Sequence, residues 1–202
     1  MMQLWFGGSF NPIHHAHLVC ARTVAETLGF EKVVLVPSGQ PPHKPKNDGI
    51  APAAHRLAMC RLAIEGDGLF EVDDLELQRQ GASYTIDTVR ELRGRGWPEV
   101  HWMIGADMLQ ILPLWHEPAA LLAETRFVIV ARPGWSIDWE SLPIPYRPLQ
   151  SQVVTAPLLQ ISATDIRKRV AEGKSIEYLT PPNVVKYITQ EGLYRNPDRS
   201  SP

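Results

Sequence analysis

Short apolar runs alternate with amphipathic stretches along nearly the whole chain, and this alternation limits the possible folds more than any other feature. The apolar runs predict six strands, at residues 3–6, 32–36, 69–72, 100–104, 127–130 and 153–155. Helical spacing of apolar residues predicts helices at 15–28, 52–64, 83–92, 109–122, 164–171 and 181–189. Alternating strands and helices build right-handed βαβ units. We therefore expect an α/β fold: a Rossmann-like, doubly wound parallel sheet in a single domain over residues 1–194, followed by a disordered polar tail, 195–202.

Composition excludes several classes of protein. A net charge of −2 over 202 residues leaves no global field for a polyanion, so we expect no nucleic-acid partner and only local phosphate sites. No apolar run approaches the roughly 20 residues of a bilayer span, and no signal peptide is evident, so we expect no membrane partner. Cys20 and Cys60 lie far apart in apolar segments, which predicts a reduced, cytoplasmic protein without a disulfide.

The loop after the first predicted strand carries the strongest chemical signal. Gly7 and Gly8 permit a tight turn and close approach to a ligand, and the following helix start favours anions. His14 and His17 are three residues apart, so both imidazoles face one side of the first helical turn. The alternative is a glycine turn with surface histidines. No thiolate or carboxylate stands at zinc-ligand spacing, and we expect no protein-held metal site.

The wording of this loop, GGSFNPIHHAH at residues 7–17, resembles the His/Thr-x-Gly-His motif of the nucleotidyltransferase superfamily, which class I aminoacyl-tRNA synthetases share. It is most similar to nicotinate mononucleotide adenylyltransferases. The resemblance implies the nucleotidyltransferase type of fold and implies that His14 and His17 contact the phosphates of ATP. Ala16 stands where the motif usually has glycine.

Two further loops are candidates for phosphate binding. The proline-rich segment 37–50 includes Lys44, and its Pro-Pro-His-Lys wording resembles a stretch of the same family, although a solvated basic loop is the alternative. Residues 161–167 place Ser162, Thr164 and Arg167 at a predicted helix start, where amides and a guanidinium suit phosphates. A plain helix cap with a surface arginine is the alternative. This segment resembles the family's Ile-Ser-Ser-Thr-x-Ile-Arg signature, with Ala163 replacing the second serine.

The middle of the chain predicts the acceptor side. Ser83 is expected to cap the helix 83–92, Asp107 follows a strand, and the indole of Trp115 could stack on a pyridine ring. A capped helix, a capping aspartate and a core tryptophan are the alternatives. These segments resemble the SYTxDT, GxD and LxxW stretches of nicotinate mononucleotide adenylyltransferases, so the resemblance runs from residue 4 to about residue 194.

The resemblance implies transfer of the adenylyl group of ATP to nicotinate mononucleotide, giving nicotinate adenine dinucleotide and pyrophosphate in NAD biosynthesis. The acceptor phosphate is already anionic, so direct in-line attack needs no general base, and Mg²⁺ arrives with ATP. Catalytic roles fall to His14, His17, Lys44 and Arg167. The ATP site comprises Gly7, Gly8, Ser9, Phe10, His14, His17, Gly105, Asp107, Ile161, Ser162, Thr164 and Arg167. The nicotinate mononucleotide site comprises Asn11, Lys44, Ser83, Tyr84, Thr85 and Trp115.

Other readings of the same residues remain. A phosphopantetheine adenylyltransferase shares the fold but lacks the SYTxDT and Trp115 features. A nucleotide sensor without turnover is a second alternative, and a nucleic-acid-binding protein is a third. The sequence leaves open the preference between nicotinate and nicotinamide, a possible homo-oligomer, and the role of residues 135–152.

Overall fold

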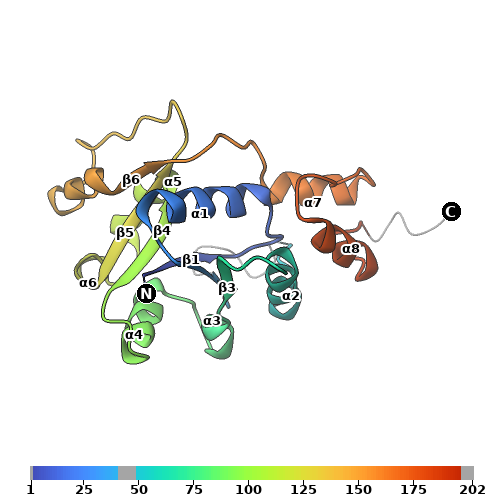
Figure 1. Ribbon diagram of the computed structural model, residues 1–202, viewed down its shortest axis with the longest axis horizontal. Helices are drawn as coiled ribbons and strands as arrows, with labels where there is room; N and C mark the ends of the chain where they lie inside the picture. Colours follow the sequence, from blue (N-terminus) through green and yellow to red (C-terminus); the bar gives the residue numbers. More distant parts are fainter. Residues whose placement is uncertain (1, 41–48, 197–202) are drawn as a thin grey trace.

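The computed structural model describes residues 2–40 and 49–196 and confirms the α/β fold (Figure 1). A six-stranded sheet, parallel throughout, has the strand order β3-β2-β1-β4-β5-β6. Its strands are β1 (Gln3–Gly8), β2 (Lys32–Pro37), β3 (Phe70–Val72), β4 (Val100–Gly105), β5 (Thr125–Ala131) and β6 (Val153–Thr155). All six agree with the predicted strands to within two residues at each end.

The helices are α1 (His15–Leu28), α2 (Ala53–Ala63), α3 (Leu75–Gln78), α4 (Thr85–Gly94), α5 (Ala106–Leu109), α6 (Pro118–Glu124), α7 (Ala163–Ala171) and α8 (Pro182–Gln190). Two 3₁₀ segments, η1 (Leu112–Leu114) and η2 (Ile144–Gln152), complete the secondary structure. The short α3 and the 3₁₀ turns of η2 were not expected from the sequence. None of the helices within the described ranges is both long enough and apolar enough to cross a bilayer.

The predicted continuous helix over 109–122 is wrong. The chain forms α5, η1 and α6 there, with Glu117 in the left-handed region at φ 47° between the last two. Pro113 and Pro118 explain the breaks, because proline removes a backbone donor and its ring clashes with the preceding turn. Pro118 instead occupies the first turn of α6, a position that tolerates it.

Two apolar cores, one on each face of the sheet, hold the layers together. Alternate residues of one strand enter opposite cores: Leu4 packs with α1, α2 and α8, whereas Trp5 packs with α4, α5 and α6. In β2, Val33 and Leu35 enter the first core and Val34 and Val36 the second. This period of two matches the pleat of a strand. Helices on both faces explain why the strands are continuously apolar, as Figure 1 shows for α1 and α4.

The strand order reverses between β1 and β4, and the two strands separate at their carboxyl ends. Their paired register comprises Leu4 with His101 and Trp5 with Trp102, while β1 stays paired to β2 as far as Gly8 and Pro37. In doubly wound sheets ligands bind in the crevice at this reversal, beyond the carboxyl ends of the strands. The loops after β1 and β4 therefore frame the place to look for chemistry.

Candidate active site

Two adjoining pockets lie at this reversal and share one wall. The shared wall includes Phe6–Ser9 at the end of β1, together with Met103, Gly105 and Met108. The larger, of about 540 Å³, is lined beyond that wall by His14, His17, Asp107, Ile161 and Ser162 among others, and we call it the histidine pocket. The smaller, of about 320 Å³, is lined by Ser83, Tyr84, Thr85, Trp115 and His116 among others, and we call it the tryptophan pocket.

The two glycines of the shared wall are required by what lies behind them. A Cβ on Gly7 would overlap Cζ2 of Trp102 and lie 3.1 Å from Cη2 of the same buried indole. A Cβ on Gly8 would lie 3.1 Å from the ring of Phe10. Packing therefore leaves no room for a side chain at Gly7 and little at Gly8, and the bare backbone where both pockets meet can approach a ligand closely.

His14 and His17 form a stacked pair at the start of α1. His14 is the residue before the first turn, and the ring centroids lie 3.6 Å apart with planes inclined by 19°. The imidazole of His17 also contacts the edge of Phe10 at a centroid distance of 5.2 Å. The spacing of three residues places both side chains on one face, as the sequence predicts, and both line the histidine pocket.

Both histidines are held neutral. Burial lowers the pKa of His14 to about 4, with a smaller contribution from His15, and burial also lowers the pKa of His17 well below its ordinary value. The backbone N–H of His14 donates to Nδ1 of His17 at 3.3 Å. A neutral imidazole that accepts at Nδ1 carries its proton on Nε2, so His17 is a hydrogen-bond donor there. Nδ1 of His14 is buried without a hydrogen-bond partner among the described residues.

We expect this burial to make stability pH-dependent. Because His14 has a pKa of about 4 in the folded chain and near 6.5 when unfolded, the unfolded state binds more protons between these values. Stability should therefore fall as the pH falls, by about 2 kcal/mol between pH 7.5 and 5 from His14 alone. Urea unfolding of wild type and His14→Gln at both pH values measures the difference. Identical pH dependence in the two proteins would contradict the assignment.

The start of α7 faces the same pocket, but its residues contribute differently. Ser162 lines the pocket and caps α7, since its Oγ accepts from the backbone N–H of Asp165 at 3.1 Å. Thr164 is exposed, and it and Arg167 lie outside the lining of the histidine pocket. Arg167 donates through Nη1 to the carbonyl of Asn11 at 2.9 Å, which joins α7 to the loop after β1.

Asn11 holds the loop after β1 in place. Its side-chain amide donates to the carbonyl of Gly49 at 3.1 Å, and its Oδ1 accepts from the N–H of Ala51 at 3.0 Å and from the hydroxyl of Tyr194 at 2.8 Å. The residue is 2% exposed and lines the histidine pocket, not the tryptophan pocket. With these hydrogen bonds in place, Asn11 shapes the loop that bounds the histidine pocket.

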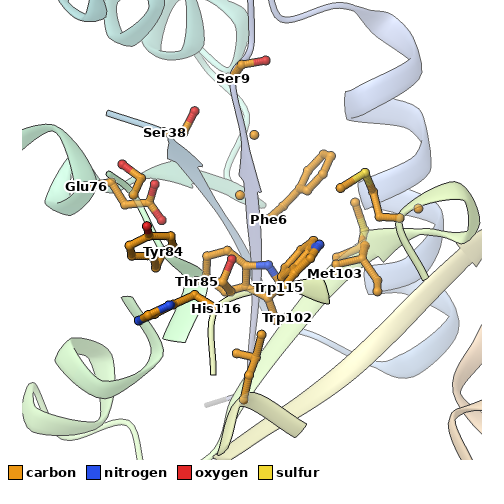
Figure 2. Close-up of a pocket in the computed structure, with 17 residues that line it drawn as sticks. Phe6, Ser9, Ser38, Glu76, Tyr84, Thr85, Trp102, Met103, Trp115 and His116 are labelled. Atoms are coloured by element: carbon orange, nitrogen blue, oxygen red, sulfur yellow. The ribbon is translucent and has the colours of Figure 1, made fainter. Parts of the chain in front are cut away.

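The tryptophan pocket brings together four of the six predicted acceptor residues, Ser83, Tyr84, Thr85 and Trp115 (Figure 2). Tyr84 and Thr85 stand at the start of α4, and the ring of His116 stacks on that of Tyr84 at a centroid distance of 4.2 Å. Figure 2 shows Ser9 and Ser38 at one end and the indoles of Trp102 and Trp115 toward the other. The pocket therefore combines a polar end with an aromatic end.

The prediction that Ser83 caps a helix is wrong. Tyr84 is the residue that precedes α4, and no side chain caps that helix. The Oγ of Ser83 instead accepts from the backbone N–H groups of Gly39 and Gln40, at 3.0 and 3.2 Å. A serine hydroxyl can accept from any nearby backbone N–H that lacks a partner. Here the N–H groups of the loop after β2 lie closer to the Ser83 hydroxyl than those at the start of α4.

Lys44 lies outside the described residues, so its expected place over the pockets stays a prediction. The lining residues outside the predicted ATP and nicotinate mononucleotide sets include Arg132 in the histidine pocket, and Glu76 and His116 in the tryptophan pocket. Arg132 directly follows β5, so the rule that pointed to the loops after β1 and β4 could also have found it. Glu76 is buried on the unexpected helix α3, and burial raises its pKa although Thr88 donates to it at 2.6 Å.

Within residues 2–40 and 49–196, no group of three or more His, Cys, Asp or Glu side chains is arranged to hold a metal ion. A divalent ion that accompanies a nucleotide is bound mainly by phosphates and water.

Comparison with known proteins shows the family to which the chain belongs. The family model described as cytidylyltransferase-like matches residues 5–169. A Thermomicrobium roseum protein named "Probable nicotinate-nucleotide adenylyltransferase" is 40% identical over 200 residues, and the match covers 98% of this chain and 93% of that protein. A Roseiflexus protein of the same name is 42% identical over 191 residues, covering 94% and 96%.

Solved structures agree with the fold. A Plasmodium falciparum nicotinic acid mononucleotide adenylyltransferase in complex with NaAD superposes with a TM-score of 0.77 at 20% identity, covering 96% of this chain and 98% of that one. The same enzyme in complex with APC gives a TM-score of 0.73 at 21% identity, covering 95% and 96%. Both likenesses extend over at least 95% of this chain, so the fold is shared over nearly its whole length.

Proposed function

This chain belongs to the nicotinate-nucleotide adenylyltransferases of the cytidylyltransferase-like family, and on that basis we propose how its two pockets carry out adenylyl transfer. The reaction moves the adenylyl group of ATP to nicotinate mononucleotide, giving nicotinate adenine dinucleotide and pyrophosphate. The observation that carries the proposal is the wall of bare glycine backbone shared by the two pockets. Two substrates that must join through their phosphates need separate pockets that meet at one point, and Gly7–Ser9 form such a point.

ATP occupies the histidine pocket in this proposal. The Nε2–H of His17 is a donor suited to phosphate oxygens, and the positive end of the α1 dipole adds favourable charge. The hydroxyl of Ser162 donates to Asp165 at 2.7 Å in the free protein and would exchange this partner for a phosphate oxygen. Because both imidazoles are neutral in the free protein, they bind ATP as hydrogen-bond donors, not as fixed charges. Lys44, Arg167 and the newly found Arg132 supply positive charge, and Asp107 stands where a ribose hydroxyl could bind.

Nicotinate mononucleotide occupies the tryptophan pocket in this proposal. The aromatic end, with Trp115 and the stacked Tyr84 and His116, accommodates a pyridine ring. The backbone N–H groups at the uncapped start of α4, at Tyr84 and Thr85, suit the carboxylate of nicotinate. Ser9, at the polar end of this pocket, belongs to the shared wall, where the acceptor phosphate would meet the α-phosphate of ATP.

In-line attack follows from this arrangement without a general base, since the acceptor phosphate is already anionic. The rate comes from alignment of the two phosphates and from donors directed at the developing charge. We further propose that Mg²⁺ is the ion delivered with ATP. The free cysteines Cys20 and Cys60 support a reducing, cytoplasmic setting, and self-association of the chain stays a prediction.

Pyrophosphate release tests the proposal. With Mg-ATP at saturation, we expect nicotinate mononucleotide to be at least about 100-fold better in kcat/KM than nicotinamide mononucleotide, since donors placed for an anion lose their partner with the amide. Phosphopantetheine should give no release above background. Comparable release with both pyridine nucleotides would contradict the carboxylate site, and ATP binding without release for any acceptor would favour a nucleotide sensor.

A further inference from the structure

Arg56 is a charged residue in the core, away from either pocket lining. It lies on α2, is 1% exposed, and has the largest of the fully buried side chains among the described residues. Across the described part of the chain, no carboxylate lies within salt-bridge distance of its guanidinium, and burial lowers its pKa. An unpaired buried charge costs free energy unless hydrogen bonds replace its hydration. The hydrogen-bond partners of the guanidinium must therefore account for the presence of this charged side chain in the core.

Its three nitrogens donate to carbonyls of three different segments. Nη1 donates to Ser9 at 2.9 Å, Nη2 to Gly39 at 3.2 Å, and Nε to Ala51 at 3.0 Å. Ser9 follows β1, Gly39 follows β2, and Ala51 leads into α2. The planar guanidinium fixes the directions of its donors, so it sets the spacing between these segments as well as joining them.

Two of the three carbonyls belong to loops that border the two substrate pockets. Ser9 is part of the wall shared by both pockets, and Gly39 adjoins Ser38, whose side chain lines the tryptophan pocket. Gly39 is also held from the other side: its N–H donates to Ser83, and a Cβ on it would lie 2.5 Å from the carbonyl oxygen of Glu76. The loop after β2 is thus wedged between α3 and Arg56 with little freedom to move.

We propose that Arg56 is a positioning residue for adenylyl transfer, which fixes the loop after β1 relative to the loop after β2. The proposal rests on the function proposed above, because the shared wall is where the two phosphates would meet. A displacement of about 1 Å between reacting groups can cost on the order of 10² in rate. Each pocket remains lined by its own residues without Arg56, so alignment is affected more than binding.

Three variants test this role. Arg56→Lys keeps the charge but lacks the planar group that donates in three directions, and Arg56→Met keeps only the bulk of the side chain. Ile188→Ala is the stability control, because it truncates a buried side chain of α8 in the core that α8 shares with α2. Measured well below the lowest Tm of the set, both Arg56 variants should lose at least about 30-fold in kcat. Their KM values for ATP and for nicotinate mononucleotide should change by less than about threefold. Ile188→Ala should keep wild-type kcat despite a lower Tm.

Amide hydrogen exchange tests the same role without turnover. In wild type the N–H of Ser38 donates to Gly8 at 2.9 Å and that of Gly39 to Ser83. Both should exchange at least about tenfold faster in the Arg56 variants while amides of β5 keep wild-type protection. If exchange and kcat of Arg56→Lys match those of Ile188→Ala, the positioning role is overturned. If wild type releases no pyrophosphate but the exchange result is as expected, the proposed function fails and the joining of the loops by Arg56 stands.

Discussion

Substitution of His17 by alanine is expected to lower kcat by about 10²- to 10³-fold, the usual effect of removing one donor aimed at developing charge. The loss has two parts in this chain. The Nε2–H donor disappears from the histidine pocket, and Nδ1 no longer accepts from the backbone N–H of His14, so the first turn of α1 loses a hydrogen bond. Steady-state pyrophosphate release at saturating Mg-ATP and nicotinate mononucleotide measures the change.

A neighbouring imidazole supplies the control. His15 precedes His17 by two residues in the same helical turn, but its backbone N–H donates to Leu179 and its side chain is outside the lining of either pocket. His15→Ala should therefore stay within about threefold of wild type. Turnover of His17→Ala within the same range would mean that the stacked histidines are structural and that the proposed mechanism is wrong.

Substitution of Gly7 by alanine is expected to damage stability and turnover together. The new methyl group would overlap the six-membered ring of Trp102, which is 3% exposed and held within the core, so either the indole or the end of β1 must move. Overpacking of this kind costs about 1–3 kcal/mol. Because Gly7 lines both pockets, we also expect kcat to fall by at least about tenfold. Urea unfolding and steady-state turnover measure the two effects.

Gly94 provides the matched comparison for Gly7. It lies in the last turn of α4, and a Cβ there would meet no atom within 4 Å. Gly94→Ala should be neutral or stabilise the chain by up to about 1 kcal/mol, as alanine does in helices. If Gly7→Ala were as stable and as active as Gly94→Ala, the shared wall would have space for a methyl group at Gly7, and the prediction would be wrong.

The sequence alone predicts those parts of the molecule that local periodicity determines. The six strands follow from short apolar runs, and the stacked pair of His14 and His17 follows from a spacing of three at a helix start. The meeting of the loops after β1 and β4 follows from the general geometry of parallel sheets. In each case the cause acts within a few residues or through a rule that holds for the whole fold class.

What could not be predicted depends on contacts between distant segments. Ser83 satisfies a loop 43 and 44 residues away instead of its own helix, and Arg56 bonds to a carbonyl 47 residues earlier. Nothing in the sequence around either residue shows these partners. The broken helix over 109–122 is different, because Pro113 and Pro118 stand in the sequence itself and proline disrupts a helix more strongly than apolar spacing favours one.

The hydrogen bonds of Asn11 join opposite ends of the polypeptide, which has a consequence for synthesis on the ribosome. The hydroxyl of Tyr194 and the guanidinium of Arg167 both bond to Asn11, while Thr180 donates to the carbonyl of Ile13 at 2.7 Å. A nascent chain that has emerged as far as β5 can pair all its strands except β6, but it lacks these three groups. During synthesis the loop after β1 therefore takes the shape described here only after the chain as far as Tyr194 has emerged, later than five of the six strands of the sheet beside it.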